Sequence, residues 1–76
     1  MELKAICFTL QNLEFNITDT KRSIDWNEKK RNEYEYGTTE YLLYDTRLQE
    51  QKDFLNTLQG LYEKLKTDLK NFEKFM

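Results

Sequence analysis

The chain has 76 residues, 38% of them hydrophobic and 34% charged, with a formal net charge of −2 and neither histidine nor proline. So short a chain is at most one small domain, and one cysteine without histidine excludes an internal disulfide and the usual zinc-binding sets. This composition is typical of long, solvated helices, so we predict one all-α domain over residues 1–76.

The first predicted helix covers about residues 2–36. Its apolar residues follow alternating steps of three and four, the heptad pattern of a helix that packs on a partner helix: Leu3, Ile6, Leu10, Leu13, Ile17 and Ile24. A short β-hairpin over residues 3–18 is the alternative, because residues 12–18 alternate between polar and apolar. We expect the helix, since its pattern is longer and Gln11-Asn12 is a poor hairpin turn.

The turn is predicted at about residues 37–38. Gly37 follows the first helical pattern, and a glycine in the left-handed conformation commonly stops a helix. Thr38 or Thr39 can cap the next helix with its hydroxyl group, and Glu40 suits the positive end of that helix dipole. Because the two arms are nearly equal in length and the connection is short, we expect an antiparallel two-helix hairpin that resembles a coiled coil.

The second predicted helix covers about residues 39–75. Its heptad positions are occupied by Tyr41, Tyr44, Leu48, Leu55, Leu58, Tyr62, Leu65, Leu69 and Phe72, with one polar interruption at Gln51. Folding the chain at Gly37 pairs core positions whose numbers add to 75, such as Leu10 with Leu65. Near the turn this rule pairs Ile24 with Gln51 and Asn27 with Leu48, so the terminal end is apolar and the turn end is more polar.

Two helices cannot bury all of the apolar side chains in this pattern. In the second helix, a further row of apolar residues beside the heptad positions widens the apolar face. In the first helix, two phenylalanines lie on the back, away from its heptad positions. We therefore predict a homodimer that forms a four-helix bundle. Its predicted interface consists of Phe8, Phe15, Phe54, Leu61 and Phe75.

Tyrosine and acidic residues are concentrated around the turn. Tyrosine supplies contact area at low entropic cost, and carboxylates can steer an encounter with a basic partner. The predicted partner-binding residues are Tyr34, Tyr36, Glu40, Tyr41 and Tyr44. The function predicted from them is a non-catalytic protein–protein interaction module, a small regulator, inhibitor or assembly factor that binds itself and a host or cognate protein.

The alternative function is a nucleic-acid-binding hairpin that uses the basic face Lys21–Arg31 with Trp26 as a stacking residue. An enzyme is not expected, because Cys7 has no histidine to activate it and fits better as a small packing residue. We expect no cofactor, metal, small-molecule substrate or membrane span, and a cytoplasmic location. In size and outline the predicted hairpin resembles the small helical inhibitors and regulators that phages and mobile elements encode, without a shared motif.

Overall fold

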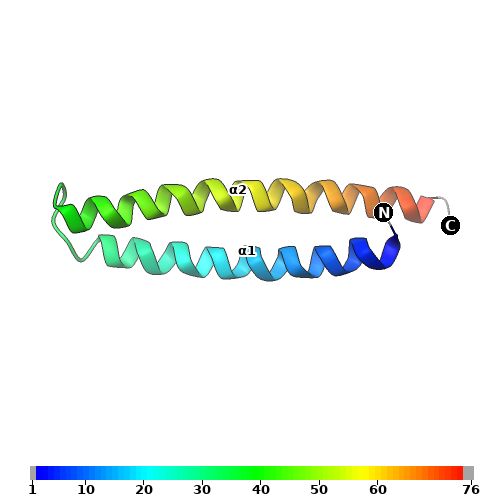
Figure 1. Ribbon diagram of the computed structural model, residues 1–76, viewed down its shortest axis with the longest axis horizontal. Helices are drawn as coiled ribbons and strands as arrows, with labels where there is room; N and C mark the ends of the chain where they lie inside the picture. Colours follow the sequence, from blue (N-terminus) through cyan, green and yellow to red (C-terminus); the bar gives the residue numbers. More distant parts are fainter. Residues whose placement is uncertain (1, 75–76) are drawn as a thin grey trace.

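The computed structural model describes residues 2–74, and in this range it consists of two antiparallel helices (Figure 1). Helix α1 covers Leu3–Arg31 and helix α2 covers Thr39–Lys74. The Cα trace is elongated, with principal extents of 57 × 14 × 14 Å. The predicted all-α hairpin is confirmed, and the residues for which a β-hairpin was the alternative are helical. In the described part of the chain, neither helix has a stretch long and apolar enough to cross a membrane.

The connection between the helices, residues 32–38, is longer than predicted, because α1 ends at Arg31 rather than near residue 36. The backbone N–H groups of Glu33 and Tyr34 each donate to the carbonyl oxygen three residues earlier, at 3.1 Å. Bonds of this kind tighten the last turn of a helix and use its free carbonyl oxygens, so the α-helix does not continue.

A second turn, formed by residues 35–38, leads directly into α2. The Thr38 N–H donates to the Glu35 carbonyl oxygen at 3.2 Å. Gly37 occupies the third position with φ +86°, as a type II turn requires. Gly37 was predicted to stop α1, but it instead precedes the cap of α2. The Thr38 Oγ1 accepts the Tyr41 N–H at 3.2 Å, which confirms the predicted threonine cap.

The core between the helices is narrow and extends along most of their length. The most buried side chains are Ile6 in α1, 1% exposed, and Leu48 in α2, 0% exposed. These two lie toward opposite ends of the hairpin, so burial is not confined to the apolar terminal end that the sequence indicated. The buried apolar residues are Ile6, Leu10, Leu13, Ile24, Leu48 and Leu58.

One polar residue belongs to this core. Asn27 is 6% exposed, and its Nδ2 donates to Gln51 Oε1 at 2.9 Å and to the Ser23 carbonyl oxygen at 3.0 Å. No buried side-chain nitrogen or oxygen in the described residues lacks a hydrogen-bond partner. The Asn27–Gln51 bond joins the two helices at one level only, so sliding one helix along the other breaks it.

Candidate functional site

The turn end of the hairpin, which we call the tip, carries an aromatic cluster centred on Tyr44. The Tyr44 ring stacks on Tyr34 with 5.9 Å between centroids and an interplanar angle of 10°. Trp26 meets Tyr44 edge-on at 6.3 Å, and the Arg47 guanidinium lies 5.5 Å from the Tyr44 centroid. These residues come from α1, the connection and α2, so the cluster holds the three segments of the tip together.

A second cluster is centred on Tyr41 in the first turn of α2. The Tyr36 ring lies 5.1 Å from the Tyr41 ring, and the Arg31 guanidinium lies 5.4 Å from the Tyr41 centroid. Arg31 Nη1 also donates to Asp45 Oδ1 at 2.9 Å, and this hydrogen bond is the main reason that the pKa of Arg31 is raised above its ordinary value. The Arg31–Asp45 ion pair therefore joins the end of α1 to the start of α2.

The five predicted partner-binding residues all lie at the tip, but their exposure differs. Tyr36 is 88% exposed, and Glu40 is also exposed in the first turn of α2. Tyr41 and Tyr44 are half-buried, and Tyr34 is only just exposed. Tyr36 and Glu40 are thus the most accessible members of the set, while Tyr41 contacts Tyr36, and Tyr34 and Tyr44 stack on each other in the other cluster.

The sequence placed Asp45 at the tip among the acidic residues around the turn, but three other residues that build the tip were missed: Trp26, Arg31 and Arg47. A signal for Arg31 was present, because the core pairing set it opposite Tyr44, next to the oppositely charged Asp45. The contact of Trp26 with Tyr44 had no such signal. It joins side chains that are offset along the hairpin axis, and heptad spacing does not describe that offset.

The predicted basic face, Lys21–Arg31, is partly used within the chain. Lys30 Nζ lies 3.4 Å from Glu33 Oε2 and 5.6 Å from the Trp26 ring centroid. Arg31 is held by Asp45. Trp26 is exposed, but two of the cations near it, Lys30 and Arg31, already have acidic partners, which weakens the case for a phosphate-binding surface.

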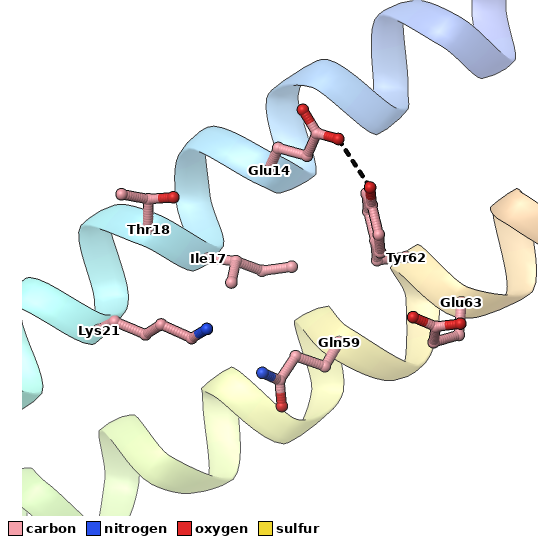
Figure 2. Close-up of a pocket in the computed structure, with 7 residues that line it drawn as sticks. All are labelled: Glu14, Ile17, Thr18, Lys21, Gln59, Tyr62 and Glu63. Atoms are coloured by element: carbon pink, nitrogen blue, oxygen red, sulfur yellow. Dashed lines mark hydrogen bonds between the residues drawn. The ribbon is translucent and has the colours of Figure 1, made fainter.

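A shallow groove runs between the helices near their middle (Figure 2). The Tyr62 hydroxyl donates to Glu14 Oε1 at 2.7 Å, and this hydrogen bond is the main reason that the pKa of Tyr62 is raised. Figure 2 shows Ile17 directed from α1 toward α2, between this pair and Lys21. The groove is lined by Glu14, Ile17, Thr18, Lys21, Gln59, Tyr62 and Glu63.

The predicted dimer-interface residues fall into two separate patches. Phe8 and Phe15 are 66% and 71% exposed, and Phe8 is about 200° around α1 from both Ile6 and Leu10, on the side away from α2. Phe54 and Leu61 are also exposed, but they lie on the flank of α2 next to its buried face. Phe75, the fifth predicted residue, lies outside the described residues.

Cys7 was interpreted as a packing residue, but it is exposed with a free thiol. Cys7 follows the buried Ile6 by one residue, which turns it about 100° away from the core. Within the described residues, no group of three or more histidine, cysteine, aspartate and glutamate side chains is placed to hold a metal ion. Comparisons with protein-family models, curated proteins and solved structures gave no significant match to this chain.

Proposed function

We propose that this hairpin is a non-catalytic protein–protein interaction module, a small regulator, inhibitor or assembly factor that binds another protein through its tip and associates with a second copy. The observation that carries the proposal is the exposure of the Tyr36 ring together with its contact with Tyr41. The Tyr36 side chain is 88% exposed, yet its ring contacts the Tyr41 ring, which the Arg31 guanidinium also contacts. An aromatic ring that is both exposed and supported is a suitable anchor for a partner pocket.

The supporting contacts reduce the entropy that binding has to overcome. Tyr36 lies in the connection, where a free side chain would sample several rotamers, and ordering such a side chain on binding opposes association by about 0.5–1.5 kcal/mol. The Tyr41 contact restricts the ring before binding. Glu35 and Glu40 are exposed close to Tyr36 in the sequence, so a partner groove with basic or polar walls complements this surface.

The test compares proteins that bind variants of the hairpin. Wild-type hairpin, the double variant Tyr36→Ala with Glu40→Ala, and the outer-face control Asn56→Ala with Lys70→Ala are used as baits in a lysate of the source organism, and bound proteins are quantified by mass spectrometry. We expect a partner retained by the wild type and the control but depleted with the tip variant. Circular dichroism should give the same helicity for all three baits. Equal recovery with the tip variant would show that recognition occurs elsewhere.

Self-association is the second part of the proposal. The hairpin leaves Phe8, Phe15, Phe54 and Leu61 exposed after its own core has formed. Each such side chain contributes about 1.5–3 kcal/mol when it is fully buried, which is large compared with the stability of so small a core. We expect a dimer or larger species in sedimentation experiments at micromolar concentration.

The nucleic-acid alternative makes an opposite prediction about salt. Binding to phosphates weakens steeply and linearly on a logarithmic scale as salt increases, whatever the sequence of the nucleic acid. Binding through an aromatic anchor depends much less on salt. A titration of single-stranded DNA and RNA at low salt, followed by the same titration at high salt, therefore separates the two functions.

A further inference from the structure

The exposed apolar side chains of α2 form a stripe with a symmetric spacing. Leu43, Phe54, Leu61 and Phe72 are all exposed, and the successive intervals between them are 11, 7 and 11 residues. Because an α-helix turns about 100° per residue, all four lie within about 20° of one another around α2. Leu42, the remaining exposed leucine of α2, lies about 100° away. The stripe therefore reads the same in both chain directions.

Charged residues lie between the apolar ones, and one pair of them, Arg47 and Asp68, has opposite signs about the same centre. Arg47 follows Leu43 by four residues, and Asp68 precedes Phe72 by four. Glu50 precedes Phe54 by four residues and Lys64 follows Leu61 by three, so Glu50 lies at the edge of the stripe and Lys64 farther from it. Along the chain the order is Leu43, Arg47, Glu50, Phe54, Leu61, Lys64, Asp68 and Phe72. About the centre between residues 57 and 58, the apolar positions exchange with one another and Arg47 exchanges with Asp68, whereas Glu50 and Lys64 correspond with an offset of one residue.

A surface of this kind is complementary to itself when a second copy is turned end for end. We propose that α2 packs antiparallel on the α2 of a second copy, about a two-fold axis that passes between Thr57 and Leu58. Leu43 then faces Phe72 of the second copy, Phe54 faces its Leu61, Arg47 faces its Asp68, and Glu50 lies beside its Lys64. This arrangement rests on the self-association part of the proposed function and specifies its surface.

Several observations favour a second copy over another occupant of the stripe. A parallel pairing would set Arg47 against Arg47 and Asp68 against Asp68, whereas the antiparallel pairing sets opposite charges together at both ends. A specific interface of standard size covers about 800 Å² on each partner, roughly an eighth of the 6015 Å² surface of this chain. The stripe extends over most of α2, which is long enough to supply that area. Phe8 and Phe15 on the back of α1 lie outside this interface.

The test uses two charge reversals, Arg47→Glu and Asp68→Arg. In a dimer of either variant alone, like charges face each other at both ends, so self-association should weaken by about tenfold. In an equal mixture, the glutamate introduced at position 47 of one chain faces the arginine introduced at position 68 of the other, and the unchanged Asp68 faces the unchanged Arg47. The mixed dimer should form with an affinity within about threefold of the wild type. Native mass spectrometry of isotope-labelled chains measures the mixed species, and sedimentation equilibrium measures the affinities.

A matched control uses Asp53→Arg and Lys74→Glu, which reverse exposed charges on the outer face of α2. Their mixture should show no preference for the mixed dimer. Since Arg47 also contacts Tyr44, circular dichroism of each variant checks that the hairpin is intact. As a second measurement, Phe54→Ser with Leu61→Ser should abolish the dimer, while Phe8→Ser with Phe15→Ser should leave it unchanged.

The outcomes separate this inference from the proposed function. We expect the wild-type chain to dimerise at micromolar concentration. If it is still monomeric at about 10⁻⁴ M, roughly 100 times higher, then both self-association and this arrangement are wrong. A wild-type dimer whose Arg47→Glu and Asp68→Arg chains mix at random overturns only the antiparallel α2 pairing. Neither result bears on recognition by the tip, which is measured separately with Tyr36 and Glu40.

Discussion

Replacing Asn27 and Gln51 by leucine, singly and together, tests whether the polar layer fixes the alignment of the helices at the expense of stability. Asn27 is almost fully buried and uses both of its amide N–H groups, one for Gln51 Oε1 and one for the Ser23 carbonyl oxygen. Gln51 is only half-buried, so water can reach its side chain. The two partners are therefore unequal, and the two single substitutions should have different effects.

The structure sets the expected magnitudes. Gln51→Leu leaves a buried Asn27 N–H without an acceptor, a penalty of about 1–3 kcal/mol that the half-buried leucine only partly offsets, so we expect a net loss of about 1 kcal/mol. In an Asn27→Leu background the same Gln51→Leu substitution adds an apolar contact and strands no polar group. It should then stabilise by about 1 kcal/mol. The expected coupling energy between the two sites is thus about 2 kcal/mol.

The assay is urea unfolding of the four proteins at one fixed protein concentration, followed by circular dichroism and by the fluorescence of Trp26, the single tryptophan. The double variant should be the most stable and Gln51→Leu the least stable. The double variant should also lose alignment, which cysteine pairs placed across the helices would detect as cross-links at several offsets. If Gln51→Leu changes the unfolding free energy equally in both backgrounds, Asn27 and Gln51 are not coupled and the reasoning fails.

Two further predictions concern glycines and pH. Gly60→Ala should raise the free energy of unfolding by about 1 kcal/mol, since Gly60 lies inside α2 and a Cβ there would meet no neighbouring atom within 4 Å. Gly37→Ala should lower it by about 1–2 kcal/mol, because the φ angle of +86° is unfavourable for alanine even though the space around it is open. Thermal unfolding measures both, and equal signs would contradict the backbone argument. The raised pKa of Tyr62 means that its bond to Glu14 stabilises the fold fully below the ordinary tyrosine value of about 10 and is lost as pH rises through the raised value. As pH rises from about 9 to beyond the ordinary tyrosine value of about 10, the melting temperature should therefore fall more for the wild type than for Tyr62→Phe, and parallel curves would refute this link.

The helices and their pairing could be predicted because burial along a helix is periodic. Ile6, Leu10 and Leu13 in α1 follow heptad spacing, and all three are buried. The pairing by number sum set Asn27 opposite Leu48 and Ile24 opposite Gln51, and the hydrogen bond from Asn27 to Gln51 joins these two neighbouring layers. Such regularities depend on only one geometric quantity, the number of residues per helical turn. The spacing of apolar residues in the sequence shows this quantity directly.

The end of α1 and the arrangement of the tip could not be predicted in this way. Tyr34 was placed in the helix, but its ring stacks on Tyr44 from the connection, after the N–H groups of residues 33 and 34 have closed the last turn. This geometry depends on the path of an irregular segment and on side chains that reach across three segments. Periodicity describes neither. The exposure of Cys7 was missed for a simpler reason, since a position next to a buried residue on a helix faces a different direction.

The proposed pairing of α2 also has a consequence for the tip. In an antiparallel dimer the two turns lie at opposite ends of the assembly, separated by about the 57 Å length of one hairpin. Tyr36 precedes Leu43, the first residue of the stripe, by seven positions, so both Tyr36 side chains are accessible at once. Arg47, which contacts Tyr44 at the tip, is the tip residue that the interface includes. Such a dimer can join two partner molecules, or bind two sites on one large assembly with an affinity higher than either tip alone provides. Self-association and recognition therefore use different surfaces, and a chain that dimerises through α2 gains a second binding site without any change at the first.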